Sequence, residues 1–89
     1  MGITLKGQLR CGPEDARIVR AALPDHIRLS RAEPGCEHFE IEESAPGVFS
    51  VEERFEDDAA LLAHQTRTRA SEWWRKTGHI PRDVRRTDT

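Results

Sequence analysis

Three ionisable side chains fall on otherwise apolar faces of this sequence, and they are the candidates for chemistry. His64 lies at the rim of the apolar side of a predicted helix, where an imidazole that titrates near neutral pH could act as a general base. A histidine that is simply hydrogen-bonded at a helix surface is the alternative. His26 lies near the centre of the apolar arc of an earlier helix, and Glu53 points inward from a strand. We expect the two to pair, as a satisfied polar cluster or as an oriented acid–base anchor.

Aromatic side chains could form the wall of a ligand site. Trp73 and Trp74 are one helical step apart, so we expect one to pack on a sheet and the other to line a cavity, with Trp74 closer in angle to His64. The three phenylalanines are expected in the core, with contact to a substrate as the alternative; they are Phe39, Phe49 and Phe55. A C-terminal arginine cluster is expected to be a solvated face or to pair with acidic residues, and a pocket arginine that steadies a phenolate is the weaker alternative; it comprises Arg82, Arg85 and Arg86.

The first half of the chain predicts a strand, a long helix and a second strand. Residues 3–11 alternate between apolar and polar types, as a half-buried strand does. Pro13 with two acidic neighbours predicts a helix start, and the 3.6-residue periodicity continues to about Ala32, with Pro24 on the solvent side. The expected apolar arc includes Ile18 and Leu29. A Pro-Gly break then precedes a strand over residues 36–43.

The second half predicts a hairpin, a helical region and a last strand. Turn residues at 44–47 lead into a strand whose alternate residues face inward up to Phe55. Asp57 and Asp58 predict a helix cap, Gly78 predicts the end of the helical region, and residues 66–68 are a candidate break within it. Residues 80–86 predict an edge strand. On that helical region the expected buried face comprises Ala59, Leu62, Ala63, Thr66, Ala70, Trp73 and Trp74.

The order strand, helix, strand, strand, helix or two helices, strand is the split βαβ pattern of an α+β, ferredoxin-like fold. Its helix-free sheet face would carry complementary charges, which suit cross-strand pairing in solvent or inside a sheet-on-sheet dimer. Strands 3–11 and 36–43 would run parallel on either side of the third strand. Cys11 and Cys36 would then lie at opposite ends of the sheet as reduced thiols, and their spacing suits neither a metal site nor a disulfide framework.

Composition and charge exclude several classes of protein. The 89 residues are 36% hydrophobic and 34% charged, which suits one small domain over residues 1–89 with a thin core that a second subunit would complete. No apolar run approaches the ~20 residues of a membrane span and the N-terminus does not resemble a signal peptide, so we expect a soluble, cytoplasmic protein without a membrane partner. Residues 1–32 carry six basic and three acidic side chains, residues 33–58 one and ten, and residues 59–89 seven and three. This segregation favours pairing within or between subunits over binding to nucleic acid.

Three segments carry a resemblance to a known family: SRAEPGCEHFEIEE at 30–43, VFSVEERFED at 48–57 and AALLAHQ at 59–65. They resemble the antibiotic biosynthesis monooxygenase family, and in particular its small, stand-alone quinol monooxygenases. The resemblance covers nearly the whole chain and is looser after Ser71. Haem-degrading relatives in the superfamily rely on an asparagine in the first strand, where this sequence has Gly7.

The resemblance implies a homodimeric α+β barrel that oxidises a hydroquinone, an anthrone or a related aromatic phenol with molecular oxygen. It implies no metal, flavin or haem cofactor. We then expect His64 to be the base, His26 and Glu53 an orienting pair, and Trp74 part of the wall, with Trp73 and the phenylalanines as further contacts. The alternative is a dimeric ligand-binding or structural module of the same fold that performs no chemistry.

Overall fold

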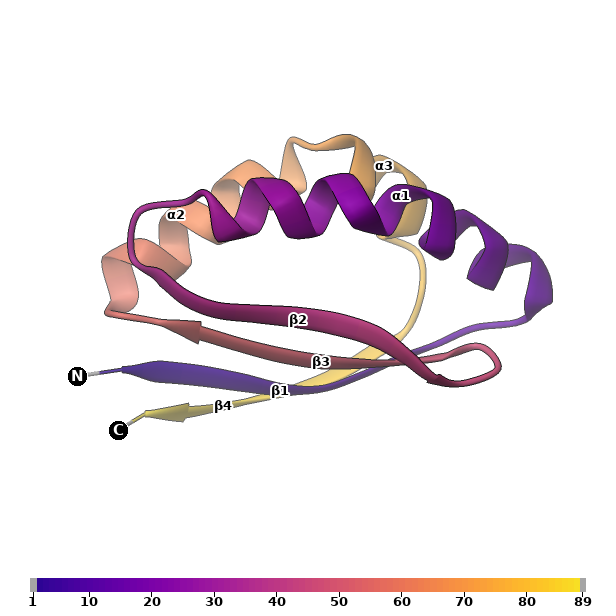
Figure 1. Cartoon of the computed structure of the whole chain (residues 1–89), viewed down its shortest axis with the longest axis horizontal. Helices are drawn as coiled ribbons and strands as arrows, with labels where there is room; N and C mark the ends of the chain where they lie inside the picture. The colour runs from indigo at the N-terminus through magenta and orange to yellow at the C-terminus, as the bar shows by residue number, and fades with distance from the viewer. Residues whose placement is uncertain (1, 89) are drawn as a thin grey trace.

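The sheet has the strand order β2-β3-β1-β4, and three helices cover one of its faces (Figure 1). The computed structural model describes residues 2–88. The elements in chain order are β1 (Ile3–Arg10), α1 (Pro13–Arg31), β2 (Cys36–Ala45), β3 (Val48–Phe55), α2 (Asp58–Arg69), α3 (Glu72–Thr77) and β4 (Arg82–Asp88). The predicted α+β, ferredoxin-like fold is therefore confirmed.

The central strand β3 determines the directions of its neighbours. It is antiparallel to both β2 and β1, so those two strands run in the same direction on either side of it. The register pairs both Ile3 and Cys36 with Phe55, whereas Arg10, next to Cys11, pairs with Val48 at the other end of β3. Both cysteines are free thiols, and they lie at opposite ends of the sheet as predicted.

Alternation along the strands builds the core. Every second residue points toward the helices, because successive side chains of a strand leave on opposite faces. On β3 this inward row contains three apolar residues and one acid, Glu53, which is 9% exposed. The apolar residues that the sheet buries against the helices are Ile3, Leu9, Phe39, Ile41, Phe49, Val51 and Phe55.

Helix α1 matches its predicted bounds to within one residue. Pro13 occupies the first turn, acidic residues follow it, and basic residues occupy the last turn, which suits the helix dipole at both ends. Pro24 lies inside the helix on the exposed side, as expected. Ile18 and Leu29 are 40% and 39% exposed. The buried stripe is therefore narrower than the predicted arc, because the sheet contacts only the middle of that arc.

Helix α2 buries a different face from the predicted one. Of the residues expected to be buried, Leu62 is 64% exposed, and Ala59, Ala63, Thr66 and Ala70 are also exposed. The helix instead buries Ala60, Leu61 and His64. Apolar residues follow one another from 59 to 63, so spacing alone selects no face, and polar contacts of His64 decide which side turns inward.

The helical region divides later than predicted. Helix α2 continues through residues 66–68 and ends at Arg69, and Ser71 then caps α3 by accepting a hydrogen bond from the Trp74 backbone N–H at 3.3 Å. The last strand also begins two residues later than predicted, at Arg82. Ile80 is buried in the connection, where its N–H bonds the Thr77 carbonyl.

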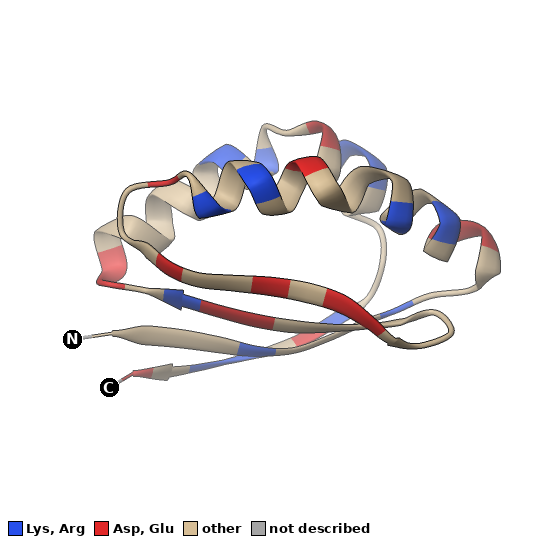
Figure 2. Cartoon of the chain, in the orientation of Figure 1, with Lys and Arg blue, Asp and Glu red and all other residues tan. Residues whose placement is uncertain are grey.

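The helix-free face of the sheet pairs charges across its strands, as expected. Lys6 on β1 lies 3.0 Å from Glu52 on β3, and His38 on β2 approaches the same carboxylate to 3.3 Å. Arg54 on β3 bonds Glu37 on β2 at 2.9 Å. Acidic residues are frequent along β2 and β3 and basic residues along β4 (Figure 2). These pairs remain partly exposed, so each contributes little stability in the isolated chain.

The turn between α1 and β2 requires a glycine at position 35. Gly35 has a φ of +83°, and a Cβ there would lie 2.6 Å from the Ala60 Cβ. We expect Gly35→Ala to lower the free energy of unfolding by about 1–3 kcal/mol, because both the backbone and α2 resist the added methyl group. Gly12→Ala is the matched control, since a Cβ at Gly12 would have no atom within 4 Å. Urea denaturation of both variants measures the difference, and equal stabilities would contradict the role of Gly35.

Candidate functional site

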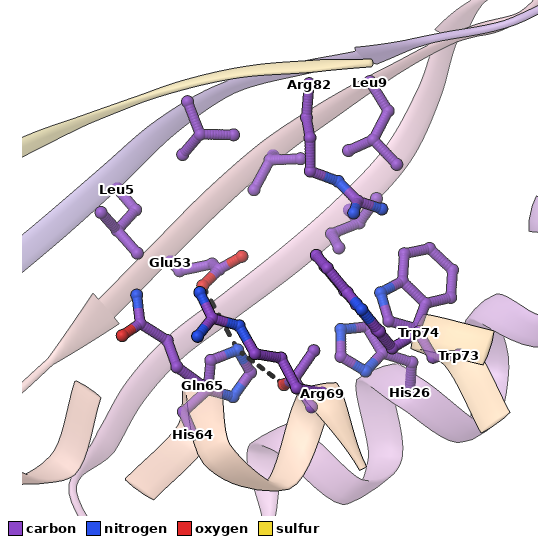
Figure 3. A pocket seen from close by; sticks show the side chains of 14 residues that line it. Leu5, Leu9, His26, Glu53, His64, Gln65, Arg69, Trp73, Trp74 and Arg82 are labelled. Carbon is purple, nitrogen blue, oxygen red and sulfur yellow. Dashed lines mark hydrogen bonds and ion pairs between the residues drawn. The ribbon is translucent and has the colours of Figure 1, made fainter. Parts of the chain in front are cut away.

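A cavity of about 180 Å³ lies between the sheet and the helices (Figure 3). An apolar cavity of about 150 Å³ holds a benzene molecule, so this space suits a small aromatic ligand. The sheet lines it with Leu5, Leu9, Ile41, Val51, Glu53, Arg82 and Val84, and the helices line it with His26, His64, Gln65, Thr68, Arg69, Trp73 and Trp74. A few polar and aromatic groups thus share the lining of the cavity with aliphatic side chains.

A carboxylate outside the cavity holds His64 in place. Glu33, in the connection between α1 and β2, places Oε1 2.7 Å from His64 Nδ1. Arg67, one turn further along α2, donates from Nε to Glu33 Oε2 at 2.6 Å and from Nη2 to Ser30 Oγ at 3.0 Å. The Glu33 carboxylate accepts hydrogen bonds and so favours a proton on Nδ1. The other ring nitrogen, Nε2, then carries the free lone pair.

The Nε2 atom of His64 makes no close hydrogen bond. The Thr68 hydroxyl lies 3.4 Å away and Glu53 Oε1 lies 3.6 Å away, both long for a hydrogen bond. Burial lowers the pKa of His64, and the neighbouring Glu33 opposes this shift in part. The imidazole is therefore neutral at physiological pH, with its basic nitrogen available.

Glu53 lies beside that nitrogen as the acidic residue of the cavity lining. Burial in the apolar wall raises the pKa of Glu53 to about 7, and the nearby Glu33 carboxylate acts in the same direction. Near neutral pH the carboxyl group is thus divided between its protonated and ionised forms. A group in this condition can both accept and return a proton.

His26 does not pair with Glu53, so that prediction is wrong. Its ring stacks on Trp73, with centroids 4.5 Å apart and planes 2° from parallel, and meets Phe39 edge-on at 5.2 Å. Nδ1 of His26 is buried without a hydrogen-bond partner among residues 2–88. Burial, helped by the nearby His64, lowers the pKa of His26 to about 3. Packing of α1 against α3 turns His26 toward the tryptophan, and His64 on α2 occupies the place beside Glu53.

Both tryptophans line the cavity, although one of them was expected to pack mainly on the sheet. Trp73 is 5% exposed and stacks on His26, and Trp74 is half-buried beneath Arg82, whose Cζ lies 4.9 Å from the ring centroid. The three phenylalanines are fully buried in the core and do not line the cavity; they are Phe39, Phe49 and Phe55.

Position 7 contributes no side chain to the site. The backbone of β4 packs so closely against Gly7 that a Cβ there would collide with the Asp83 carbonyl oxygen. An asparagine could not enter the cavity from this position without displacing β4. Among residues 2–88, no group of three or more His, Cys, Asp and Glu side chains is placed to hold a metal ion.

Two residues that hold His64 in place, Arg67 and Glu33, were not predicted from the sequence. Arg67 follows His64 by three residues, a spacing that places both on one face of a helix, so it could have been found from the pattern. Glu33 carries no such signal, since it lies 31 residues from His64 in a helix–strand connection. Arg82, considered as a minor alternative, extends into the cavity (Figure 3).

Comparisons with known proteins agree on the fold. A family model described as antibiotic biosynthesis monooxygenase matches residues 2–76. A candidate antibiotic biosynthesis monooxygenase from Nitrosomonas europaea has a TM-score of 0.86 at 18% identity, with coverage of 99% of this chain and 89% of that one. A similar candidate from Deinococcus radiodurans has a TM-score of 0.77 at 23% identity, with coverage of 100% and 92%. Rv0793 from Mycobacterium tuberculosis has a TM-score of 0.78 at 22% identity, with coverage of 100% and 95%.

No curated protein sequence matches the chain significantly. Within residues 2–88, the helices lack the length and apolar character that a membrane span requires.

The buried Glu53 makes stability depend on pH. The folded protein holds its proton up to about pH 7, while the unfolded chain releases it near the ordinary pKa of 4.5. Stability from the neutral carboxyl group is therefore present below pH 4.5 and lost as the pH rises through 7. We expect Glu53→Gln to stabilise the protein by about 3 kcal/mol at about pH 9 and to have little effect at about pH 4. Urea denaturation at both pH values measures this, and a pH-independent effect would contradict it.

Proposed function

The chain belongs to the antibiotic biosynthesis monooxygenase family, and on that premise we propose that it oxidises a hydroquinone, an anthrone or a related aromatic phenol with molecular oxygen. In this proposal the protein supplies a base and a shaped cavity rather than a bound cofactor. The observation that carries the proposal is the free lone pair of His64 Nε2 in a cavity that is also lined by Trp73 and Trp74.

In the proposed reaction the protein has mainly to deprotonate the phenol and to position it. Oxygen in its ground state is a triplet, so a two-electron reaction with a closed-shell phenol is forbidden by spin. A phenolate can instead transfer one electron to oxygen, which gives an aryloxyl radical and superoxide. The enzyme therefore has to generate the phenolate, hold it near oxygen and exclude water.

The steps balance with oxygen as the oxidant. His64 Nε2 takes the phenol proton, one electron passes to oxygen, and the two radicals combine to form a carbon–oxygen bond. The O–O bond then breaks, one oxygen atom stays on the ring, and the other leaves as water with two hydrogens taken from the substrate. The proton held by His64 returns to the departing oxygen, which restores the base.

Glu33 acts on the reaction through His64. Its carboxylate favours the Nδ1–H tautomer and stabilises the imidazolium that forms when Nε2 takes a proton. Arg67 holds Glu33 in this orientation through a 2.6 Å hydrogen bond. Glu33 and Arg67 are therefore positioning residues, and Glu53, beside Nε2, is a second group that can exchange a proton with the substrate.

The aromatic wall supports a planar substrate. His26 and Trp73 form a stacked pair, and Trp74 continues the wall toward Arg82. Stacking of an aromatic ring against such a wall is favourable, and His26 is neutral and adds no charge. This arrangement supports an aromatic substrate over an aliphatic one.

We also propose that two copies pack through the helix-free faces of their sheets. That face carries Lys6, His38 and Glu52 in half-exposed pairs, which a second copy would cover and so strengthen. Light scattering on the eluted protein is expected to give twice the 10.2 kDa of one chain. A stable, folded monomer in dilute solution would overturn this arrangement.

Turnover tests the proposed activity directly. Purified, metal-free protein is expected to accelerate oxygen uptake by members of a panel of hydroquinones and anthrones, with ¹⁸O from labelled oxygen appearing in the product. His64→Gln is expected to lower kcat roughly 10²- to 10⁴-fold, because the phenol then loses its base. His79→Gln is the matched control, since His79 is exposed and pairs with Asp15, and neither residue lines the cavity.

A second variant separates positioning from packing. Glu33→Gln is expected to lower kcat and to move the acid limb of the pH–rate profile to lower pH, because the carboxylate raises the pKa of His64. A purely structural Glu33 would leave that limb in place. If no panel member reacts faster than its autoxidation, the monooxygenase proposal fails and a non-catalytic binding module of the same fold takes its place.

A further inference from the structure

Arg82 is half-buried at the cavity, and part of the hydrogen-bonding capacity of its guanidinium is unused. Arg82 pairs with Leu9 across β1 and β4, so its side chain leaves the sheet on the helix side. Figure 3 shows it extending toward Trp73 and Trp74. Nη2 donates to the carbonyl and hydroxyl oxygens of Thr77, each at 3.2 Å. Nη1 is buried and has no partner among residues 2–88.

The acidic residue of the cavity lining, Glu53, balances this charge only in part. An arginine remains protonated in a protein, even where burial opposes its charge, as it does here. Glu53 attracts Arg82 electrostatically, but its carboxylate lies beside His64, and no ion pair or hydrogen bond joins it to Arg82 within residues 2–88. Arg69, on the exposed rim of the cavity, adds a second positive charge. A half-buried cation with a buried, unpartnered donor has lost part of its hydration, and an anion placed against that donor restores the lost interaction.

We infer that the cavity binds an aromatic acid, with the carboxylate of the ligand on Arg82 Nη1 and its ring against Trp73 and Trp74. This inference makes the proposed substrate class more specific: a phenol or hydroquinone that carries a carboxylate. That the bound acid is oxidised rests on the proposed function. The binding site itself stands on the free donor, the cavity and the aromatic wall.

The cavity also limits the size of the acid. About 180 Å³ is little more than the ~150 Å³ that holds benzene, and binding sites for larger ligands begin at about 300 Å³. One ring fits inside, and a second would extend to the opening near Arg69. The inferred ligand is therefore a benzoate or a naphthoate, which narrows the proposed substrates to phenols and hydroquinones of one or two rings and leaves out the three-ring anthrones.

A pair of nearly isosteric probes tests the inference without turnover. 2-Naphthoate and 2-naphthamide have the same ring and differ in charge, and neither is a hydroquinone. Titration calorimetry on the full chain is expected to show the acid binding about tenfold more tightly than the amide, because a hydrogen bond between two charged groups is stronger than one to a neutral acceptor. Equal affinities, or no binding of the acid at millimolar concentration, would overturn the inference.

Variants on the same strand assign the effect to one residue. Arg82→Gln is expected to remove the preference for the acid, and Arg82→Lys to retain part of it. Arg85→Gln is the matched control, since Arg85 pairs with Lys6 and faces the other side of the sheet; it is expected to bind like the wild type. If Arg82→Gln binds the acid with full preference, the inference is wrong. If the protein binds 2-naphthoate selectively but oxidises no hydroquinone, the anion site is supported and only the proposed monooxygenase activity is contradicted.

Discussion

The carboxylate of Glu33 is the contact on which the site depends. It lies where α1 passes into β2, and it joins that connection to His64 and Arg67 on α2. A side chain that is 14% exposed and bonded to two partners is costly to disturb, because removing it leaves His64 Nδ1 and Arg67 Nε without their acceptor. The contact therefore determines which face of α2 turns inward and which nitrogen of His64 faces the cavity.

The cavity combines groups that burial makes neutral with one cation that burial cannot neutralise. Loss of hydration lowers the pKa of His26 to about 3 and raises that of Glu53 to about 7, so near neutral pH His26 is uncharged and Glu53 is only partly ionised. Arg82 stays charged, since a guanidinium does not lose its proton in a protein. The interior consequently favours a planar, electron-rich ligand that brings a negative charge of its own.

The alternating strand pattern and the residues that begin or cap the helices were sufficient to predict the order and approximate bounds of the helices and strands. The inward rows of the strands, the Pro13 start of α1, the exposed Pro24 and the Asp57 cap of α2 follow from local rules that act within a few residues. Local rules do not predict which face of α2 is buried, because five consecutive apolar residues, from 59 to 63, make several faces equally apolar. His26 and Glu53 were correctly expected to point inward, but the sequence did not predict which residues they would contact.

The sequence by itself determined the order of the elements, the strand faces and the set of ionisable groups that had to be buried. The tertiary structure decided their pairing: His64 with Glu33 across 31 residues, His26 with Trp73, and Arg82 over Trp74. Local patterns report how a residue lies relative to its neighbours in the chain. The rotation of one helix against another is set by contacts between distant segments, and no periodicity within either segment records it.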